Sequence, residues 1–422
     1  MIGAGPAMPR GDGARAFYGW RVVGASFAVL TLAFGAAYAF PAFFDPLARD
    51  FPGSRGNIAL VFAVCGFLFF VVGAAAGPLA DRIGSRPVVS AGVVLVGAGL
   101  VLASFGQTLW QVLLAYGLGV GFGVGLAYVP AVSPVQRWFV RQRGRASGFA
   151  VAGIGVGTFV GPLLAAAIMR VGDWRLAWLA IGIGAAVLGL VAAQFLIDAP
   201  DHVGQRPDGD AVPAAAAGAA APIGWSLSPA LTTKPFILLY AAILASSVPL
   251  FVPFVHIVPF ARDLDISPDT AVLLASLIGV GSIAGRFGLG SLADRFGRRP
   301  TLAAMFLGLT LMLGLWLASS TPWPLAIFAV VYGACYGGFV ALVPAVIIDY
   351  LGARNAGAII GALYTGVAPG TLIGPPLAGY AFDLWGSYTV PLAVAIGFMA
   401  LATIITYAAP DPAKWRAAHP PR

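Results

Sequence analysis

The stretch from Leu273 to Pro300 reads LLASLIGVGSIAGRFGLGSLADRFGRRP. It begins with an apolar run of about 20 residues, which is the length that one membrane-spanning helix needs, and it ends in a basic turn. Arg286 is the one charged residue inside the apolar run. A charge near the centre of a bilayer costs about 2.5–3.5 kcal/mol on insertion scales, so such a residue usually faces a partner or a watery cavity. Arg286 is therefore the first candidate for a functional residue.

The composition of the whole chain indicates an integral membrane protein. Of its 422 residues 59% are hydrophobic and 9% are charged, and the mean hydropathy is +0.91, whereas soluble proteins carry about 25% charged residues. The net charge of +8 does not indicate a nucleic-acid partner, because the basic residues are dispersed between apolar runs. The two cysteines are far apart inside apolar runs, so neither a disulfide framework nor a metal site is expected, and no cofactor is implied.

Apolar runs of spanning length predict twelve helices. They lie near residues 18–44, 56–80, 87–106, 109–135, 145–170, 174–198, 234–261, 268–293, 300–319, 323–349, 355–381 and 387–409. The segment 199–233 is rich in Pro, Ala, Gly and Asp and has no sustained apolar period, which is typical of a linker. We therefore expect one six-helix half over residues 1–198 and a second over residues 234–422.

The basic turn occurs twice. GPLADRIGSRP at residues 77–87 recurs as GSLADRFGRRP at residues 290–300, an offset of 213. The same offset maps Gly148, Gly153, Gly157, Gly161 and Pro162 onto Gly361, Gly366, Gly370, Gly374 and Pro375. These matches predict two parallel repeats related by an axis along the membrane normal, with a substrate bound between them near the midplane.

The distribution of basic residues predicts the orientation. On one side of the predicted helices lie Arg49, Arg55, Arg170, Arg175 and Arg262, whereas eighteen of the other basic residues lie on the side of both termini and of the linker. Because loops rich in Lys and Arg stay in the cytoplasm, both termini and the linker are expected there. The expected location is the plasma membrane.

The repeated turn resembles the loop signature of the major facilitator superfamily. The resemblance implies gating and structural roles for six of its charged residues, namely Asp81, Arg82, Arg86, Asp294, Arg295 and Arg299. Glycines allow a tight turn there, and the Asp can pair with Arg and with helix ends. The alternative is that the basic residues only set the topology.

A second stretch, WFVRQRGRASGFAVAG at residues 138–153, resembles the fifth-helix signature of the monocarboxylate transporter family and adds Arg141 and Arg143 to the gating set. Residues 18–20 (YGW) are similar to that family's other signature, and residues 38–41 (YAFP) reproduce a run after which its animal members have a lysine; here Ala42 follows. Close helix packing alone is the alternative explanation of the small residues.

In that family an Asp commonly stands four residues before the substrate-binding arginine, where this chain has Ser282. Arg286 would then be an unpaired guanidinium whose natural guest is a carboxylate, unless it reaches a helix end or the membrane surface instead. Relatives that exchange oxalate carry a second basic residue in the eleventh helix, but residues 355–381 contain none. One positive charge favours a monocarboxylate.

Counting residues from the helix ends places Tyr128 and Tyr364 within about a turn of Arg286, and Tyr332, Tyr336 and Phe339 have i, i+4 and i+7 spacing on one helix. The resemblance adds Tyr38, which lies in the family's run, and Ser282 at the position of the family's Asp. The candidate wall residues are Tyr38, Tyr128, Tyr332, Tyr336, Phe339, Tyr364 and Ser282. Each aromatic residue could instead serve packing. His256, the one histidine inside a predicted span, is a candidate proton carrier, with an ordinary hydrogen-bonded histidine as the alternative.

Together these features predict an all-α membrane protein of the major facilitator fold, similar to a bacterial member of the monocarboxylate transporter family. The resemblance implies proton-coupled symport of a small monocarboxylate such as L-lactate or pyruvate, carried by a monomer. An anion exchanger of the oxalate/formate type, a carboxylate sensor and, least of all, a membrane enzyme are the alternatives.

Overall fold

The computed structural model describes residues 17–210, 224–352 and 354–419. Within these ranges twelve helical segments are long and apolar enough to cross a membrane, six before residue 199 and six after residue 233. An isolated bridge between Gly224 and Gly352 accompanies the helices. The predicted number of spans and the all-α fold class are therefore confirmed.

Seven helices form the N-terminal half: α1 (Gly19–Tyr38), α2 (Phe40–Asp50), α3 (Arg55–Ile83), α4 (Ser85–Ser104), α5 (Leu109–Trp138), α6 (Arg143–Met169) and α7 (Trp174–Ala193). Eight helices form the C-terminal half: α9 (Lys234–Leu250), α10 (Pro253–Asp263), α11 (Pro268–Phe296), α12 (Arg298–Ala318), α13 (Pro322–Leu351), α14 (Ala356–Tyr364), α15 (Val367–Trp385) and α16 (Thr389–Ala408). Short elements lie outside the spans: η1 (Pro200–Val203), η2 (Pro207–Gly209), α8 (Leu227–Leu231) and α17 (Pro412–Ala418).

Three spans are broken into two helices, which the sequence did not predict. The first breaks at Ala39, the seventh around Val252, and the eleventh around Thr365. The first two breaks are related by the repeat offset of 213, and each has a proline in the first turn of the helix that follows, where the missing N–H costs nothing. The first span also continues to Asp50, beyond the predicted end near residue 44, so Asp45 lies inside α2.

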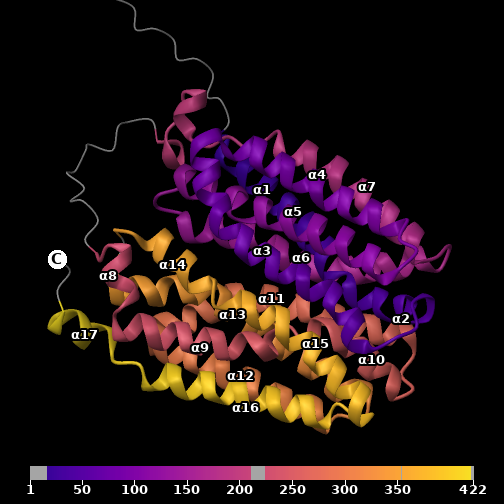
Figure 1. Cartoon of the computed structure of the whole chain (residues 1–422). Coiled ribbons are helices and arrows are strands. Elements are labelled where there is room, and N and C mark those ends of the chain that lie inside the picture. Colours follow the sequence, from indigo (N-terminus) through magenta and orange to yellow (C-terminus); the bar gives the residue numbers. More distant parts are fainter. Residues whose placement is uncertain (1–16, 211–223, 353, 420–422) are drawn as a thin grey trace, which may run out of the picture.

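The two halves lie side by side, as Figure 1 shows. We call the end with η1, α8 and α17 the linker end, and the end with α2 and α10 the far end (Figure 1). The repeated turns lie at the linker end, where Gly84 and Gly297 have φ angles of 91° and 89°. Side chains rarely adopt this region, so the repeated glycine is a conformational requirement of the turn.

Between the halves, α6 and α11 approach closely through glycines. A Cβ on Gly155 would lie 2.5 Å from Cγ1 of Ile283, and a Cβ on Gly279 would lie 2.4 Å from the backbone nitrogen of Phe159. Small residues let two membrane helices pack at short distance. This packing brings the backbone of α6 beside Arg286, which lies two turns after Gly279 on α11.

An arginine at the start of α3 joins the halves at the far end. Arg55 donates from its two terminal nitrogens to the carboxylate oxygens of Asp263, each at 2.7 Å, and from Nη1 to the hydroxyl of Tyr388 at 3.1 Å. Its guanidinium lies 3.8 Å from the ring centroid of Phe382, and its backbone N–H donates to Asp383 at 3.0 Å. We call these five residues the far-end junction.

Two further ion pairs between the halves lie at the same end. Arg170 pairs with Asp269 at 2.8 Å, and Arg262 lies 3.7 Å from Asp45. The other ion pairs among the described residues stay within one half or join it to the 199–233 segment. The ion pairs between the halves therefore lie at the far end. In the described part of the chain, no ion pair joins the halves at the linker end.

Candidate functional site

A cavity lies between the two halves. The N-terminal half contributes Phe34, Tyr38, Phe69, Phe70, Gly73, Ala74, Tyr128, Val129 and Ile154. The C-terminal half contributes Leu250, Phe251, Arg286, Tyr336, Phe339, Val340, Gly361, Tyr364 and Val367.

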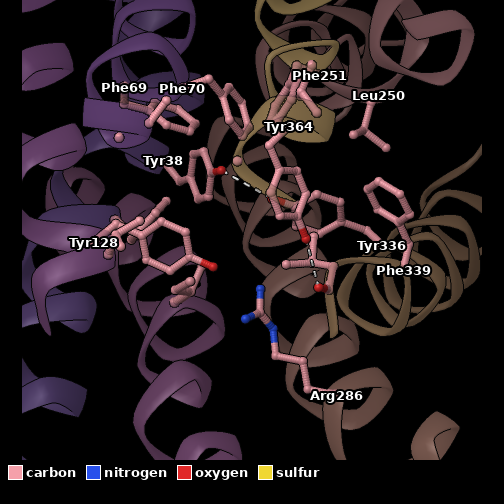
Figure 2. Close-up of a pocket in the computed structure, with 18 residues that line it drawn as sticks. Tyr38, Phe69, Phe70, Tyr128, Leu250, Phe251, Arg286, Tyr336, Phe339 and Tyr364 are labelled. Atoms are coloured by element: carbon pink, nitrogen blue, oxygen red, sulfur yellow. Dashed lines mark hydrogen bonds between the residues drawn. The ribbon is translucent and has the colours of Figure 1, made fainter. Parts of the chain in front are cut away.

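Arg286 reaches this cavity from α11, and Figure 2 shows its guanidinium directed toward the tyrosines. Its Nε donates to Oγ of Ser282 at 3.3 Å, and its Nη1 donates to the carbonyl of Val151 on α6 at 3.2 Å. Its Nη2 is buried and has no hydrogen-bond partner among the described residues, and the residue as a whole is 8% exposed. The guanidinium is thus positioned by both halves, with one nitrogen free.

Five of the predicted aromatic residues lie on the cavity wall: Tyr38, Tyr128, Tyr336, Phe339 and Tyr364. The hydroxyls of Tyr38 and Tyr336 lie 3.2 Å apart, which joins the halves across the cavity (Figure 2). The hydroxyl of Tyr364 donates to the carbonyl of Val340 at 3.2 Å.

Two predicted wall residues lie outside the cavity lining. The ring of Tyr332 is fully buried, and its hydroxyl donates to the carbonyl of Leu250 at 2.9 Å, where α9 ends without a helical partner for that carbonyl. Tyr332, predicted as a wall residue, is held by this hydrogen bond in the helix packing and is not part of the cavity lining. Ser282 is 1% exposed and reaches the site through Nε of Arg286 instead of through the lining.

Aromatic rings close the cavity toward the far end. Phe254, 2% exposed, packs against Tyr38, Phe251 and Tyr336, with ring centroids 5.0, 5.7 and 5.3 Å apart. Rings at such separations interlock well in edge or tilted arrangements. This layer separates the cavity from the far-end junction.

Sequence reasoning missed four of the nine aromatic residues in the lining, although the repeat contained a clue. Phe251 stands at the repeat position of Tyr38, and Gly73 stands at the repeat position of Arg286; both line the cavity. Applying the offset to each predicted site residue would have found them. Phe34, Phe69 and Phe70 have no comparable signal, because phenylalanines are common in membrane helices that only pack.

The residues predicted for gating lie at the linker end, and each recorded contact stays within one half or reaches the 199–233 segment. Asp81 pairs with Arg137 at 2.5 Å, and Arg86 donates to the carbonyl of Leu196 at 3.3 Å. The remaining contacts join Arg299 to the carbonyl of Ala409, Arg143 to the carbonyl of Phe139, Arg295 to the ring of Phe296, and Arg141 to Asp210. Arg82 and Asp294 are exposed in the repeated turns.

Asp208 fastens the 199–233 segment to the loop before α6. Its Oδ2 accepts from the backbone N–H groups of Val140 and Arg141 at 3.1 and 2.9 Å. Burial by itself would raise the pKa of Asp208, but these N–H groups and the charge of Arg141 outweigh it and hold the pKa below its usual range. Asp208 is therefore a carboxylate at neutral pH.

His256 lies at the far end and not on the cavity wall. It is fully buried, with Nε2 2.8 Å from the carbonyl of Pro375 and Nδ1 3.0 Å from the hydroxyl of Tyr388. Because a carbonyl only accepts, Nε2 carries a proton and donates. The expected alternative of a hydrogen-bonded histidine matches this placement.

The lining leaves few chemical possibilities. Its one charged side chain is Arg286, and none of its residues is an Asp, Glu, Lys, His or Cys. In the described part of the chain no three His, Cys, Asp or Glu are grouped as metal ligands. The arrangement suits binding of a single anionic group.

Comparisons with known proteins agree with the fold. Residues 25–260 and 237–422 match the Major Facilitator Superfamily. Human "Monocarboxylate transporter 11" is 31% identical over 401 residues, covering 91% of this chain and 80% of the relative. Rat "Monocarboxylate transporter 3" is 30% identical over 410 residues, covering 95% of this chain and 80% of the relative.

Among solved structures, a bacterial homologue of the human lysosomal transporter Spinster, in an inward-facing and unoccupied conformation, has a TM-score of 0.70. It is 16% identical, and the match covers 93% of this chain and 96% of that one, so it supports the fold alone. The family match over nearly the whole chain and the two relatives at 30% identity or more lead to one assignment. The chain belongs to the Major Facilitator Superfamily and, within it, to the monocarboxylate transporter family.

Proposed function

We propose that this protein is a secondary active transporter of monocarboxylates, with L-lactate and pyruvate as the first substrates to test and with proton symport as its mechanism. The observation that carries the proposal is the buried, unpartnered Nη2 of Arg286 in a cavity shared by both halves. A buried donor without a partner is costly, and a carboxylate that enters the cavity relieves that cost. The names of the relatives support the same class of substrate.

Carboxylate recognition follows from the shape of the guanidinium. Two of its nitrogens are already positioned, by Ser282 and by Val151, which leaves the third to donate to the substrate. The hydroxyl of Tyr128 points toward the guanidinium (Figure 2) and supplies a second donor. Two donors on either side of a carboxylate can each donate a hydrogen bond to one of its oxygens. Arg286 and Tyr128 together therefore fit a single carboxylate group.

Charge balance supports proton coupling. Arg286 stays with the protein during transport, so a carboxylate that crosses alone would move one negative charge against a negative-inside membrane potential. A co-transported proton makes the cycle electroneutral. In our proposal the proton therefore accompanies the substrate.

Alternating access would proceed by rocking of the two halves around the cavity. The far-end junction and the aromatic layer around Phe254 would open when the linker end closes. The excess of basic residues near the linker end supports a cytoplasmic position for both termini in the plasma membrane. Because one chain builds the whole cavity, a monomer suffices for transport.

The test is uptake of labelled lactate, pyruvate, formate and oxalate into proteoliposomes that hold the purified full chain, with imposed pH gradients. We expect an inward proton gradient to drive accumulation of monocarboxylates. Arg286→Ala should lower kcat/KM about 30-fold or more, the range for removing one partner of a buried charged contact. Arg416→Ala, a change of the same type on the exposed part of α17, is the matched control and should have no effect.

The outcomes separate the alternatives. Unchanged uptake by Arg286→Ala would remove the proposed anchor. Exchange of one anion for another without net uptake under the proton gradient would replace symport by anion exchange. Binding that depends on Arg286 without any uptake would indicate a sensor.

A further inference from the structure

The polar groups of the cavity that have no protein partner lie on one side of it. Of the four tyrosine hydroxyls in the lining, those of Tyr38, Tyr336 and Tyr364 already have protein partners, although in the Tyr38–Tyr336 pair the accepting hydroxyl keeps its own O–H. The hydroxyl of Tyr128 has no hydrogen bond to any other described residue, and in Figure 2 it lies beside the guanidinium of Arg286. A guest therefore finds its strongest donors at one place, where its carboxylate would bind.

The remaining wall is aromatic and aliphatic. Phe69 and Phe70 lie with ring centroids 4.2 Å apart, and each contacts a ring from another helix: Phe34 at 5.9 Å from Phe69, and Phe251 at 5.9 Å from Phe70. We call Phe34, Phe69, Phe70 and Phe251 the phenylalanine cage. Their side chains offer no hydrogen bond to a hydroxyl or an ammonium group on the body of a guest.

The cage makes polar substituents unfavourable. A hydroxyl placed against these rings gives up its bonds to water without replacement, whereas an apolar group gains from leaving water. An ammonium group is attracted to ring faces, but it lacks a carboxylate partner, because no lining residue is acidic, and it shares the cavity with the positive charge of Arg286. We therefore expect the carboxylate to be the one charged group of a guest.

The size of the cavity exceeds the smallest monocarboxylates. The centre of a water molecule can reach about 100 Å³ of it, and roughly 10–15 Å³ of such space holds one water. Several waters therefore fit, and a lactate ion bound at Arg286 would leave water against the phenylalanine cage. A longer apolar body would displace that water.

We propose that the preferred guests are monocarboxylates with an uncharged apolar body, aromatic or branched, in preference to short hydroxy acids and to amino acids. This inference rests on the proposed function, in that it takes Arg286 as the carboxylate anchor. The body of the guest lies in the phenylalanine cage, and the carboxylate lies between Arg286 and Tyr128.

A series of four acids tests each part of this inference separately. Binding to the purified full chain is measured by calorimetry for 3-phenylpropanoate, L-phenyllactate, L-phenylalanine and L-lactate. Phenyllactate adds one hydroxyl to phenylpropanoate, phenylalanine replaces that hydroxyl by an ammonium group, and lactate removes the ring. We expect phenyllactate to bind with an affinity at least about tenfold higher than that of lactate. Phenylpropanoate should bind at least as tightly as phenyllactate, and phenylalanine should show no measurable binding.

A variant of the cage links the preference to the structure. Phe70→Ala should lower the ratio of phenyllactate to lactate affinity about tenfold, because it removes a ring from the wall while leaving the carboxylate donors in place. Phe398→Ala, on the outer surface of α16 where the side chain is 39% exposed, is the matched control and should leave the ratio unchanged. The ratio is independent of how much protein folds.

Failure of this inference can be told from failure of the proposed function. Lactate binding as tightly as phenyllactate, or phenylalanine binding like phenyllactate, with both lost in Arg286→Ala, would overturn the apolar preference and leave the anchor intact. An unchanged ratio in Phe70→Ala would overturn the role of the cage. Binding of all acids that survives Arg286→Ala, or no binding of any of them, would overturn both proposals.

Discussion

Replacement of Arg55 by alanine should open the far end of the protein. The side-chain contacts of Arg55 with Asp263, Tyr388 and Phe382 all reach the other half, so they exist only while the far end is closed. The two charged side chains are 23% and 35% exposed, so the ion pair is partly screened by water. The variant therefore weakens one conformation and leaves the contacts within each half unchanged.

The size of the effect follows from these contacts. A solvent-accessible ion pair contributes about 0.2–1 kcal/mol, a net hydrogen bond about 0.5–1.5 kcal/mol, and a cation over an aromatic ring about 0.5–1 kcal/mol. A combined loss of roughly 2 kcal/mol changes the ratio of far-end-closed to far-end-open protein about 30-fold.

Distances between spin labels at the far end measure this ratio. Val171 and Trp323 are 82% and 80% exposed and belong to different halves, so cysteines at these positions can carry the labels. Cys65 and Cys335 are replaced by serine beforehand. We expect the population with a long label-to-label distance to rise about 30-fold relative to the short one in Arg55→Ala.

Arg175→Ala is the matched control at the same end. Arg175 pairs with Asp50 at 2.7 Å and lies 4.1 Å over the ring of Trp174, and all three residues are in the N-terminal half. Its loss should not change the distance distribution. An equal response of Arg55→Ala and Arg175→Ala would refute the reasoning, and closure of the far end would then be assigned to helix packing.

Three further changes test other parts of the structure. Ser282→Asp places a carboxylate one turn before Arg286, where it competes with the substrate, so KM in uptake assays should rise about tenfold with little change in kcat. Gly155→Val forces a side chain toward Ile283, and overpacking of about 1–3 kcal/mol should lower both the unfolding temperature and the transport rate. Asp208→Asn should cost about 1 kcal/mol in thermal unfolding at pH 7. The lowered pKa of Asp208 means that this stabilisation is complete above the unfolded-state pKa of about 3.9 and is lost as the pH falls through the folded-state pKa.

Each of these changes has a control and a contradicting result. Ser282→Asn keeps the shape without the charge, and a KM rise as large as that of the Asp variant would argue against competition for Arg286. Gly184 has open space around its Cβ position, so Gly184→Val should be neutral, and an equal loss in both valine variants would make the helix contact irrelevant. Asp201→Asn changes an exposed residue of the same segment as Asp208, and a stability difference for Asp208→Asn that persists in acid would contradict its role as a carboxylate acceptor.

The candidate site was partly predictable from the sequence. Arg286 could be found because a single charge in an apolar run stands out against its neighbours. Tyr336 and Tyr332, four residues apart on one helix face, could not be distinguished, since the choice depends on a carbonyl that becomes free where α9 ends. The break that frees this carbonyl is itself absent from any hydropathy pattern.

The sequence by itself determined the twelve spans, the repeated turn with its glycine at positive φ, and the one charge of the cavity. These features depend on local properties, namely hydropathy over about 20 residues and the conformational freedom of glycine. The tertiary structure decided which phenylalanines line the same cavity as Arg286 and which charged residues form ion pairs at the far end. Arg55 and Asp263 are 208 residues apart, and only the packing of one half against the other brings them together.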